Sequence, residues 1–322
     1  MASRLRVAVA GATGETGRSV VDALLTTPDK FEVIALARPE SVGKQVLVDF
    51  SERGAIVKSV DLTEVTATVV GVLTGMDVVI ACLTLAQYQE QMILIEASSR
   101  AKVKRYVPGF FAPPCPPRGV SSLREKKEDM FDRIRCLYLP FTVIDVGWWY
   151  QLSLPPLPSG RLQTRFELST LEILGDGEVP SALIDNRDIG KYVARIIADP
   201  RTLNKMVFAY SEVWTQNGIW TTLETLSGEP IAREHLSKED LSNIISQART
   251  ILSKAPEAKA QLQLAMSEYK MSMGIRGDNT PEHGKYLGYL DAKELYLDVK
   301  TVSLKTFIEE MLQGKVRQIY SS

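Results

Sequence analysis

Residues 7–24 decide the fold of this chain, and their sequence is Val-Ala-Val-Ala-Gly-Ala-Thr-Gly-Glu-Thr-Gly-Arg-Ser-Val-Val-Asp-Ala-Leu. The run Val7–Ala10 is short, apolar and rich in β-branched residues, which predicts a buried strand. Gly11, Gly14 and Gly17 follow at intervals of three, and apolar residues at helical spacing come next. A strand, a glycine turn and a helix in this order predict the first βα unit of an α/β fold.

The three glycines fit a dinucleotide-binding turn. Gly11 would allow the tight turn out of the strand, Gly14 would let a pyrophosphate approach the backbone, and Gly17 would let the helix lie close to the strand. The amide groups and positive dipole end of the helix would favour the phosphates. The spacing G-x-x-G-x-x-G is that of short-chain dehydrogenase relatives, and the alternative is a tight turn in another α/β protein. The predicted pyrophosphate site comprises Gly11, Thr13, Gly14, Glu15, Thr16 and Gly17.

The next predicted strand, at 31–37, ends directly before Arg38. In a dinucleotide-binding fold this position meets the adenosine ribose, where an acidic residue favours NAD and an arginine pairs with the 2′-phosphate of NADP. We therefore expect NADPH/NADP+ as the cofactor, bound by Arg38 with help from Ser41 and Lys44. The alternative is that Arg38 is an exposed surface arginine.

Further apolar runs predict strands at 55–60, 76–82, 103–108 and 141–147, with helices between them. This repetition predicts a Rossmann-type, doubly wound parallel sheet. The pattern loosens after a proline-rich stretch that ends near residue 158, and it becomes mainly helical from 215 onward. We expect a cofactor domain at 1–158, to which 182–200 returns, and a smaller, helix-rich, substrate-binding cap domain at 159–322.

Residues at the carboxyl ends of these strands are candidates for the ligand crevice. Asp61, with Leu62 beside it, would meet the adenine amino group, or it would cap the next helix instead. Thr84 would border the ribose and nicotinamide. Aromatic side chains at two further strand ends either line a substrate pocket or form inter-domain core; these are Phe110, Phe111, Trp148, Trp149 and Tyr150.

Composition limits the classes of function. The chain has 322 residues, 45% of them apolar, and a formal net charge of −1, so nothing favours nucleic acid or an anionic membrane as a partner. No apolar run approaches the length of a transmembrane helix. The three cysteines are too few and scattered for a disulfide framework or a zinc site, so we expect no metal and a reducing, cytoplasmic location.

Several segments together resemble the NmrA-like, isoflavone-reductase-like family, an atypical branch of the short-chain dehydrogenases. The resemblance rests on residues 11–17, 103–108, 141–149, 184–192 and 277–280, and so spans nearly the whole chain. It implies NADPH and the reduction of small organic substrates, often aromatic or polyketide-like. The family also contains members thought to be redox sensors without catalysis.

The resemblance also implies a catalytic lysine early in the helix after the fifth strand, which falls on Lys127, or on Lys126 if the register differs by one. A lysine beside the nicotinamide could stabilise negative charge or relay a proton. The alternative is that this charge run is a solvated helix face. The Tyr-x-x-x-Lys pair of typical short-chain dehydrogenases is absent, because Leu123 stands at the tyrosine position. Polar residues usual in the family are replaced in the segment 109–112.

These observations predict an NADPH-dependent reductase of a small aromatic or polyketide-like carbonyl or enone, of the kind found in secondary metabolism. The second hypothesis is a non-catalytic NADP(H)-binding regulator that docks on a protein partner. It requires the glycine turn and Arg38 but not Lys127. A third is isomerisation or cyclisation without net redox change.

Overall fold

The computed structural model describes residues 4–162, 172–317 and 319. The predicted buried strand forms β1 at the centre of a parallel sheet whose strand order is β3-β2-β1-β4-β5. The order reverses beside β1, so the carboxyl ends of β1 and β4 border the crevice in which such sheets bind ligands. The strands are β1 (Leu5–Ala10), β2 (Phe31–Ala37), β3 (Ile56–Ser59), β4 (Val78–Ala81) and β5 (Arg105–Val107).

Three later strands continue this layer. β6 (Thr142–Val146) lies beside β5 through a bridge between Tyr106 and Phe141, and β10 (Lys205–Ala209) pairs with β6 in parallel. β13 (Leu290–Asp291) pairs in parallel with β10. Strands from both sides of residue 158, the expected domain boundary, therefore build one layer.

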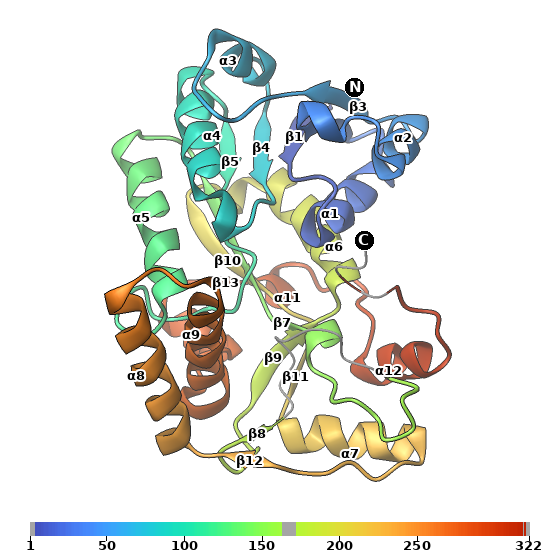
Figure 1. The fold of residues 1–322 in the computed structure, drawn as a ribbon. Coiled ribbons are helices and arrows are strands. Elements are labelled where there is room, and N and C mark those ends of the chain that lie inside the picture. The colour runs from blue at the N-terminus through green and yellow to red at the C-terminus, as the bar shows by residue number, and fades with distance from the viewer. Residues whose placement is uncertain (1–3, 163–171, 318, 320–322) are drawn as a thin grey trace.

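Alternate residues of β1 face opposite sides of the sheet, as the two-residue period of a strand requires. Val7 and Val9 pack in the core beneath α1 (Glu15–Leu25), α2 (Gln45–Glu52) and α6 (Asn186–Ala198). Ala8 and Ala10 pack in the core beneath α3 (Ala67–Leu73), α4 (Tyr88–Arg100) and α5 (Ser122–Cys136). Helices thus cover both faces (Figure 1), so the doubly wound, Rossmann-type sheet is confirmed.

Helix α6 lies unusually close to α1. A Cβ atom added to Gly190 would be 1.9 Å from the carbonyl oxygen of Ser19. The Ser19 hydroxyl accepts a hydrogen bond from the Gly190 amide at 2.9 Å and donates one to the Arg187 carbonyl at 3.1 Å. Residues 186–198 therefore support the helix that follows the glycine turn.

A second lobe occupies the lower half of Figure 1. It contains a small sheet of order β11-β9-β7, in which β9 is antiparallel to β11, and a parallel pair, β8-β12. Its core includes Tyr150, Trp220 and Phe307. Residues 163–171 of the predicted cap domain lie outside the described part of the chain. The elements of this lobe are β7 (Trp148–Trp149), β8 (Ile173–Leu174), β9 (Ser181–Ile184), β11 (Glu212–Trp214), β12 (His235–Leu236), α7 (Gln216–Ser227), α8 (Lys238–Lys254), α9 (Ala258–Lys270) and α12 (Leu304–Leu312). Two short helices, α10 (Pro281–Tyr286) and α11 (Ala292–Leu295), pack instead beside β13 of the central layer.

Short helical turns connect several of these elements. Helix α9 is followed directly by a π-helical stretch, Met271–Arg276. The 3-10 turns are Pro39–Ser41, Leu85–Gln87, Tyr150–Leu152 and Pro200–Thr202. Within residues 4–162, 172–317 and 319, no helix has both the length and the apolar character needed to cross a bilayer.

Candidate functional site

Two of the three glycines are required by close backbone contacts. Gly11 has φ +76°, and a Cβ atom there would be 2.3 Å from the carbonyl oxygen of Cys82. A Cβ atom on Gly17 would be 2.1 Å from the carbonyl oxygen of Gly11. Gly14 is the N-cap residue of α1, so no side chain caps the first amide groups of that helix. The turn is therefore tightly packed and ends at a helix N-terminus suited to an anion.

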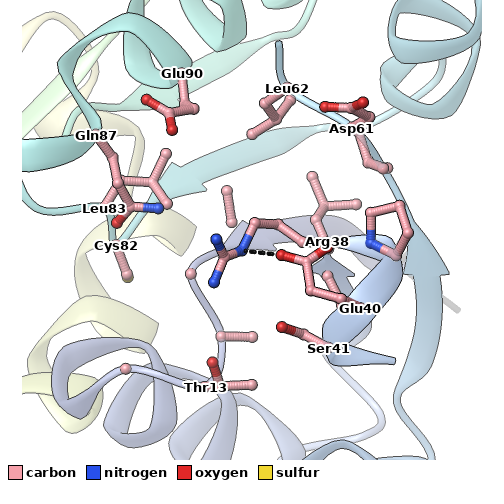
Figure 2. A pocket seen from close by; sticks show the side chains of 18 of the residues that line it. Thr13, Arg38, Glu40, Ser41, Asp61, Leu62, Cys82, Leu83, Gln87 and Glu90 are labelled. Carbon is pink, nitrogen blue, oxygen red and sulfur yellow. Dashed lines mark ion pairs between the residues drawn. The ribbon is translucent and has the colours of Figure 1, made fainter. Parts of the chain in front are cut away.

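A first pocket of about 480 Å³ opens at the carboxyl ends of β1, β2 and β4. Figure 2 shows side chains from these strand ends converging on it. It brings together eight of the predicted cofactor residues: Gly11, Thr13, Gly14, Arg38, Ser41, Asp61, Leu62 and Thr84.

Arg38 lies at the centre of this pocket with Glu40 beside it (Figure 2). The two side chains form an ion pair, Nε to Oε1 at 3.1 Å, and each is 63% exposed. Ser41 is buried in the pocket wall, and its amide donates a hydrogen bond to the Arg38 carbonyl at 2.8 Å. Lys44 is exposed and does not line the pocket, because the 3-10 turn before it leads the chain away to the start of α2.

Asp61 lines the first pocket and does not cap the next helix. Its carboxylate accepts a hydrogen bond from the Thr63 amide at 3.0 Å. The N-cap of α3 is Thr66, whose hydroxyl accepts a bond from the Val69 amide at 3.2 Å. The helix-capping alternative is therefore wrong.

A second pocket of about 610 Å³ adjoins the first and shares Thr13, Gly14 and Thr84 with it. The glycine turn forms one side and α5 the other. Its further lining includes the predicted residues Glu15, Thr16, Phe110, Phe111, Lys127 and Trp149.

Lys127 is buried in this second pocket, whereas its neighbour Lys126 is exposed. The Nζ atom of Lys127 donates a hydrogen bond to the carbonyl oxygen of Phe110 and lies 5.7 Å from the centre of the Phe110 ring. Burial disfavours the ammonium form and lowers the pKa of Lys127 to about 8. This group can exchange a proton near neutral pH.

Behind Lys127 lies a buried polar network built on Arg124. Its Nη1 atom is 2.5 Å from Oδ2 of Asp145, and its Nε atom donates to Oε1 of Glu128 at 2.7 Å. Its Nη2 atom donates to the Tyr289 hydroxyl at 2.9 Å. Burial has the largest influence on the pKa of Lys127. The charge of Asp145 raises that pKa, and the charge of Arg124 lowers it further. The network therefore sets the electrostatic environment of the amine.

The predicted aromatic residues separate into two groups. Phe111 and Trp149 line the second pocket, and Phe111 has φ +30°, a strained conformation for a bulky residue. Phe110 also borders it, although its side chain is almost fully buried. Trp148 and Tyr150 do not line the pocket.

The direction of the chain explains this division. Trp148 and Trp149 are neighbours in β7, so their side chains point to opposite sides. Tyr150 is fully buried, and its hydroxyl donates to Oε2 of Glu212 at 3.0 Å. Its ring centre lies 5.4 Å from that of Phe307. The expectation that Trp148 and Tyr150 belong to the substrate pocket is corrected: they pack in the core of the second lobe.

The departure from the family pattern at Gly109 has a steric explanation. A Cβ atom at Gly109 would be 2.5 Å from Oε1 of Gln91. Gln91 is buried, and its Nε2 atom donates to the Thr84 carbonyl at 3.0 Å. The Gln91 side chain thus takes the space that a side chain at position 109 would need.

Sequence reasoning missed Tyr269, which reaches the second pocket from α9. It lies 142 positions beyond Lys127, and no local motif marks it. Only tertiary structure brings the two side chains to one pocket. Among the residues that the structure describes, no group of three or more His, Cys, Asp or Glu side chains is placed to hold a metal ion.

Comparisons with known proteins show the family to which the chain belongs. The NmrA-like family model matches residues 3–133. Asnovolin J 5′,6′-dehydrogenase of Aspergillus novofumigatus is 40% identical over 314 residues, which cover 96% of each chain. An isoflavone reductase-like protein of Olea europaea is 24% identical, over 97% of this chain and 100% of its own.

Solved structures give the same fold. Leucoanthocyanidin reductase of Vitis vinifera, in a binary complex with NADPH, superposes with a TM-score of 0.79 at 20% identity. The match covers 96% of this chain and 99% of that one. The resemblance noted in the sequence is thereby confirmed, and the chain belongs to the NmrA-like, isoflavone-reductase-like family.

Proposed function

We propose that this protein is an NADPH-dependent oxidoreductase of secondary metabolism that reduces a carbonyl or enone of a small aromatic or polyketide-like substrate. The observation that carries the proposal is the position of Lys127, a buried amine in a pocket that adjoins the glycine-turn pocket. The names of the relatives, a dehydrogenase and an isoflavone reductase-like protein, support a redox enzyme.

The first pocket fits NADPH. No side chain caps the first amide groups of α1 at Gly14, which lines the pocket, and this suits a pyrophosphate. Arg38 would pair with the 2′-phosphate, with Ser41 beside it. Asp61 and Leu62 would border the adenine. The diphosphate and ribose would be held by Thr84 and by the remaining residues of the glycine turn, which are Thr13, Glu15 and Thr16.

The chemistry then divides between cofactor and protein. Bound NADPH supplies the hydride. Lys127, with a pKa of about 8, is mostly protonated at pH 7 and can stabilise negative charge on the substrate oxygen or give it a proton. Phe111 and Trp149 give the pocket apolar walls that suit an aromatic or polyketide-like substrate.

Each lobe has a role in this proposal. Residues 1–158, with 182–200, bind the cofactor. The part of 159–322 that lies outside 182–200 and outside β10 and β13, which complete the central layer, acts as the substrate cap. Helix α9 of that cap contributes Tyr269 to the second pocket.

The test combines cofactor binding with turnover. NADPH affinity is measured by calorimetry, and NADPH oxidation is then followed with aromatic ketones, enones and quinones. We expect NADPH binding and turnover of at least one substrate class. Lys127→Met should lower kcat by about 100-fold or more while NADPH affinity stays within twofold. Lys126→Met is the matched control, because its exposed side chain should leave both unchanged.

Other outcomes select other functions. NADPH binding without turnover of any substrate, together with capture of a protein partner that depends on NADP(H), would identify the regulator. Turnover that is unaffected by Lys127→Met would remove the lysine from the mechanism. Failure to bind either nicotinamide coenzyme would contradict both functions.

A further inference from the structure

The second pocket lacks the tyrosine that typical short-chain dehydrogenases place four residues before their lysine. Leu123 occupies that position, and its side chain lines the pocket. A leucine cannot donate a hydrogen bond to a substrate oxygen. Of the described residues that line this pocket, Tyr269 is the one tyrosine, and it comes from α9 in the other lobe.

Tyr269 is held in place from two sides. Its ring centre lies 5.7 Å from that of Trp148, with the ring planes inclined at 51°. The preceding residue, Glu268, is fully buried and accepts hydrogen bonds from the amide and hydroxyl of Ser122, both at 2.7 Å. Ser122 is the first residue of α5, the helix that carries Lys127. The helix with the phenol is thus fixed to the helix with the amine.

The Tyr269 hydroxyl has no hydrogen-bond partner among the described residues that would compete with a ligand. The Tyr269 side chain is half-buried and borders the second pocket. Burial raises the pKa of Tyr269, so the phenol stays neutral and keeps its proton for donation throughout the working pH range.

We propose that Tyr269 is a catalytic residue that donates a hydrogen bond to the substrate oxygen on which negative charge develops, in the pocket that Lys127 also lines. This inference rests on the proposed reductase function. For a ketone, hydride adds to the carbonyl carbon and the C=O π pair moves to the oxygen. That oxygen takes a proton from the Lys127 ammonium, and water later returns a proton to the amine. Tyr269 keeps its proton and stabilises the developing oxyanion.

The test compares Tyr269→Phe, which removes only the hydroxyl, with the wild type and with Tyr286→Phe. Tyr286 is 85% exposed and lies outside the pocket, so it is a matched control. We expect Tyr269→Phe to lower kcat/KM by about 10- to 1000-fold, mostly through kcat. NADPH affinity and the melting temperature should not change, and the basic limb of the pH profile, set by Lys127, should stay in place.

The outcomes separate this inference from the function on which it rests. If Lys127→Met abolishes turnover while Tyr269→Phe keeps kcat/KM within twofold, Tyr269 is not a donor and the reductase stands. If Tyr269→Phe loses NADPH affinity or thermal stability together with activity, its role is structural and the inference is wrong. If the wild type turns over no ketone, enone or quinone, the proposed function fails and the role of Tyr269 fails with it.

Discussion

Arg124 and Asp145 form a buried ion pair directly behind the proposed catalytic pocket. Nη1 lies 2.5 Å from Oδ2, and the two side chains are 5% and 0% exposed. The Tyr289 hydroxyl also donates to the same carboxylate oxygen. One carboxylate therefore balances a buried guanidinium and also favours the charged form of Lys127.

Asp145→Asn should destabilise the protein by about 3–5 kcal/mol, because it leaves the buried Arg124 charge uncompensated. Chemical denaturation at pH 7 measures this difference. The control is Asp298→Asn, which breaks an exposed pair with Arg195 and should cost about 1 kcal/mol or less. Since Asp145 raises the pKa of Lys127, the folded variant should also lose activity at a lower pH than the wild type. Equal costs for the two substitutions would show that the buried pair has no special importance.

The pKa of Lys127 predicts opposite pH trends for activity and stability. If the ammonium form is needed, kcat should fall as the pH rises through about 8. Stability should rise between about pH 8 and the usual lysine pKa near 10.4, because the unfolded chain there binds a proton that the folded chain has released. Lys127→Met should therefore be more stable than the wild type at pH 7, by about 3 kcal/mol or less, and this advantage should vanish by pH 10.5. Denaturation of both proteins across this pH range measures it. A difference that does not vary with pH would contradict the lowered pKa.

The sequence was sufficient to predict the features that are written in contiguous residues. The strand and turn around Gly11, and Arg38 at the end of the next strand, are local patterns with a physical meaning, and the structure brings them to one pocket. Lys127 could be placed from a family resemblance and the helical period. The sequence could place these residues because each placement depends on a few neighbouring residues, and their roles in binding and catalysis stay predictions.

The features that the sequence could not predict depend on tertiary structure. Trp148 and Tyr150 could not be assigned, because a two-residue strand decides which of three consecutive aromatic residues faces the pocket. Gly109 needed the position of Gln91 to explain it. Tyr269 enters the site from a distant helix, so no spacing in the sequence could have indicated it.

The ion pair between Arg38 and Glu40 predicts a selective effect on cofactor affinity. Arg38→Ala should lower the affinity for NADPH by about 10- to 100-fold, which corresponds to about 1.5–3 kcal/mol, and leave the affinity for NADH nearly unchanged. Glu40→Gln should raise the affinity for NADPH a few-fold, because it frees the Arg38 guanidinium and removes a negative charge near the 2′-phosphate. Calorimetric titration with both coenzymes measures these effects. Arg53→Ala is the control, since Arg53 pairs with Asp22 outside the first pocket. If Arg38→Ala loses equal affinity for NADPH and NADH, Arg38 does not recognise the 2′-phosphate.

The contact between α1 and α6 predicts that a substitution far from any ligand will weaken cofactor binding. In Gly190→Ala the new methyl group would lie 1.9 Å from the Ser19 carbonyl, so α1 or α6 must shift. We expect a loss of about 1–3 kcal/mol in stability and weaker NADPH binding, because α1 begins at the glycine turn. Gly71→Ala in α3 meets open space and should instead stabilise by up to about 1 kcal/mol, with NADPH affinity unchanged. Thermal unfolding and NADPH titration of the two variants distinguish a helix propensity effect from steric contact. If Gly190→Ala gains stability as Gly71→Ala does, the close approach of the two helices is wrong.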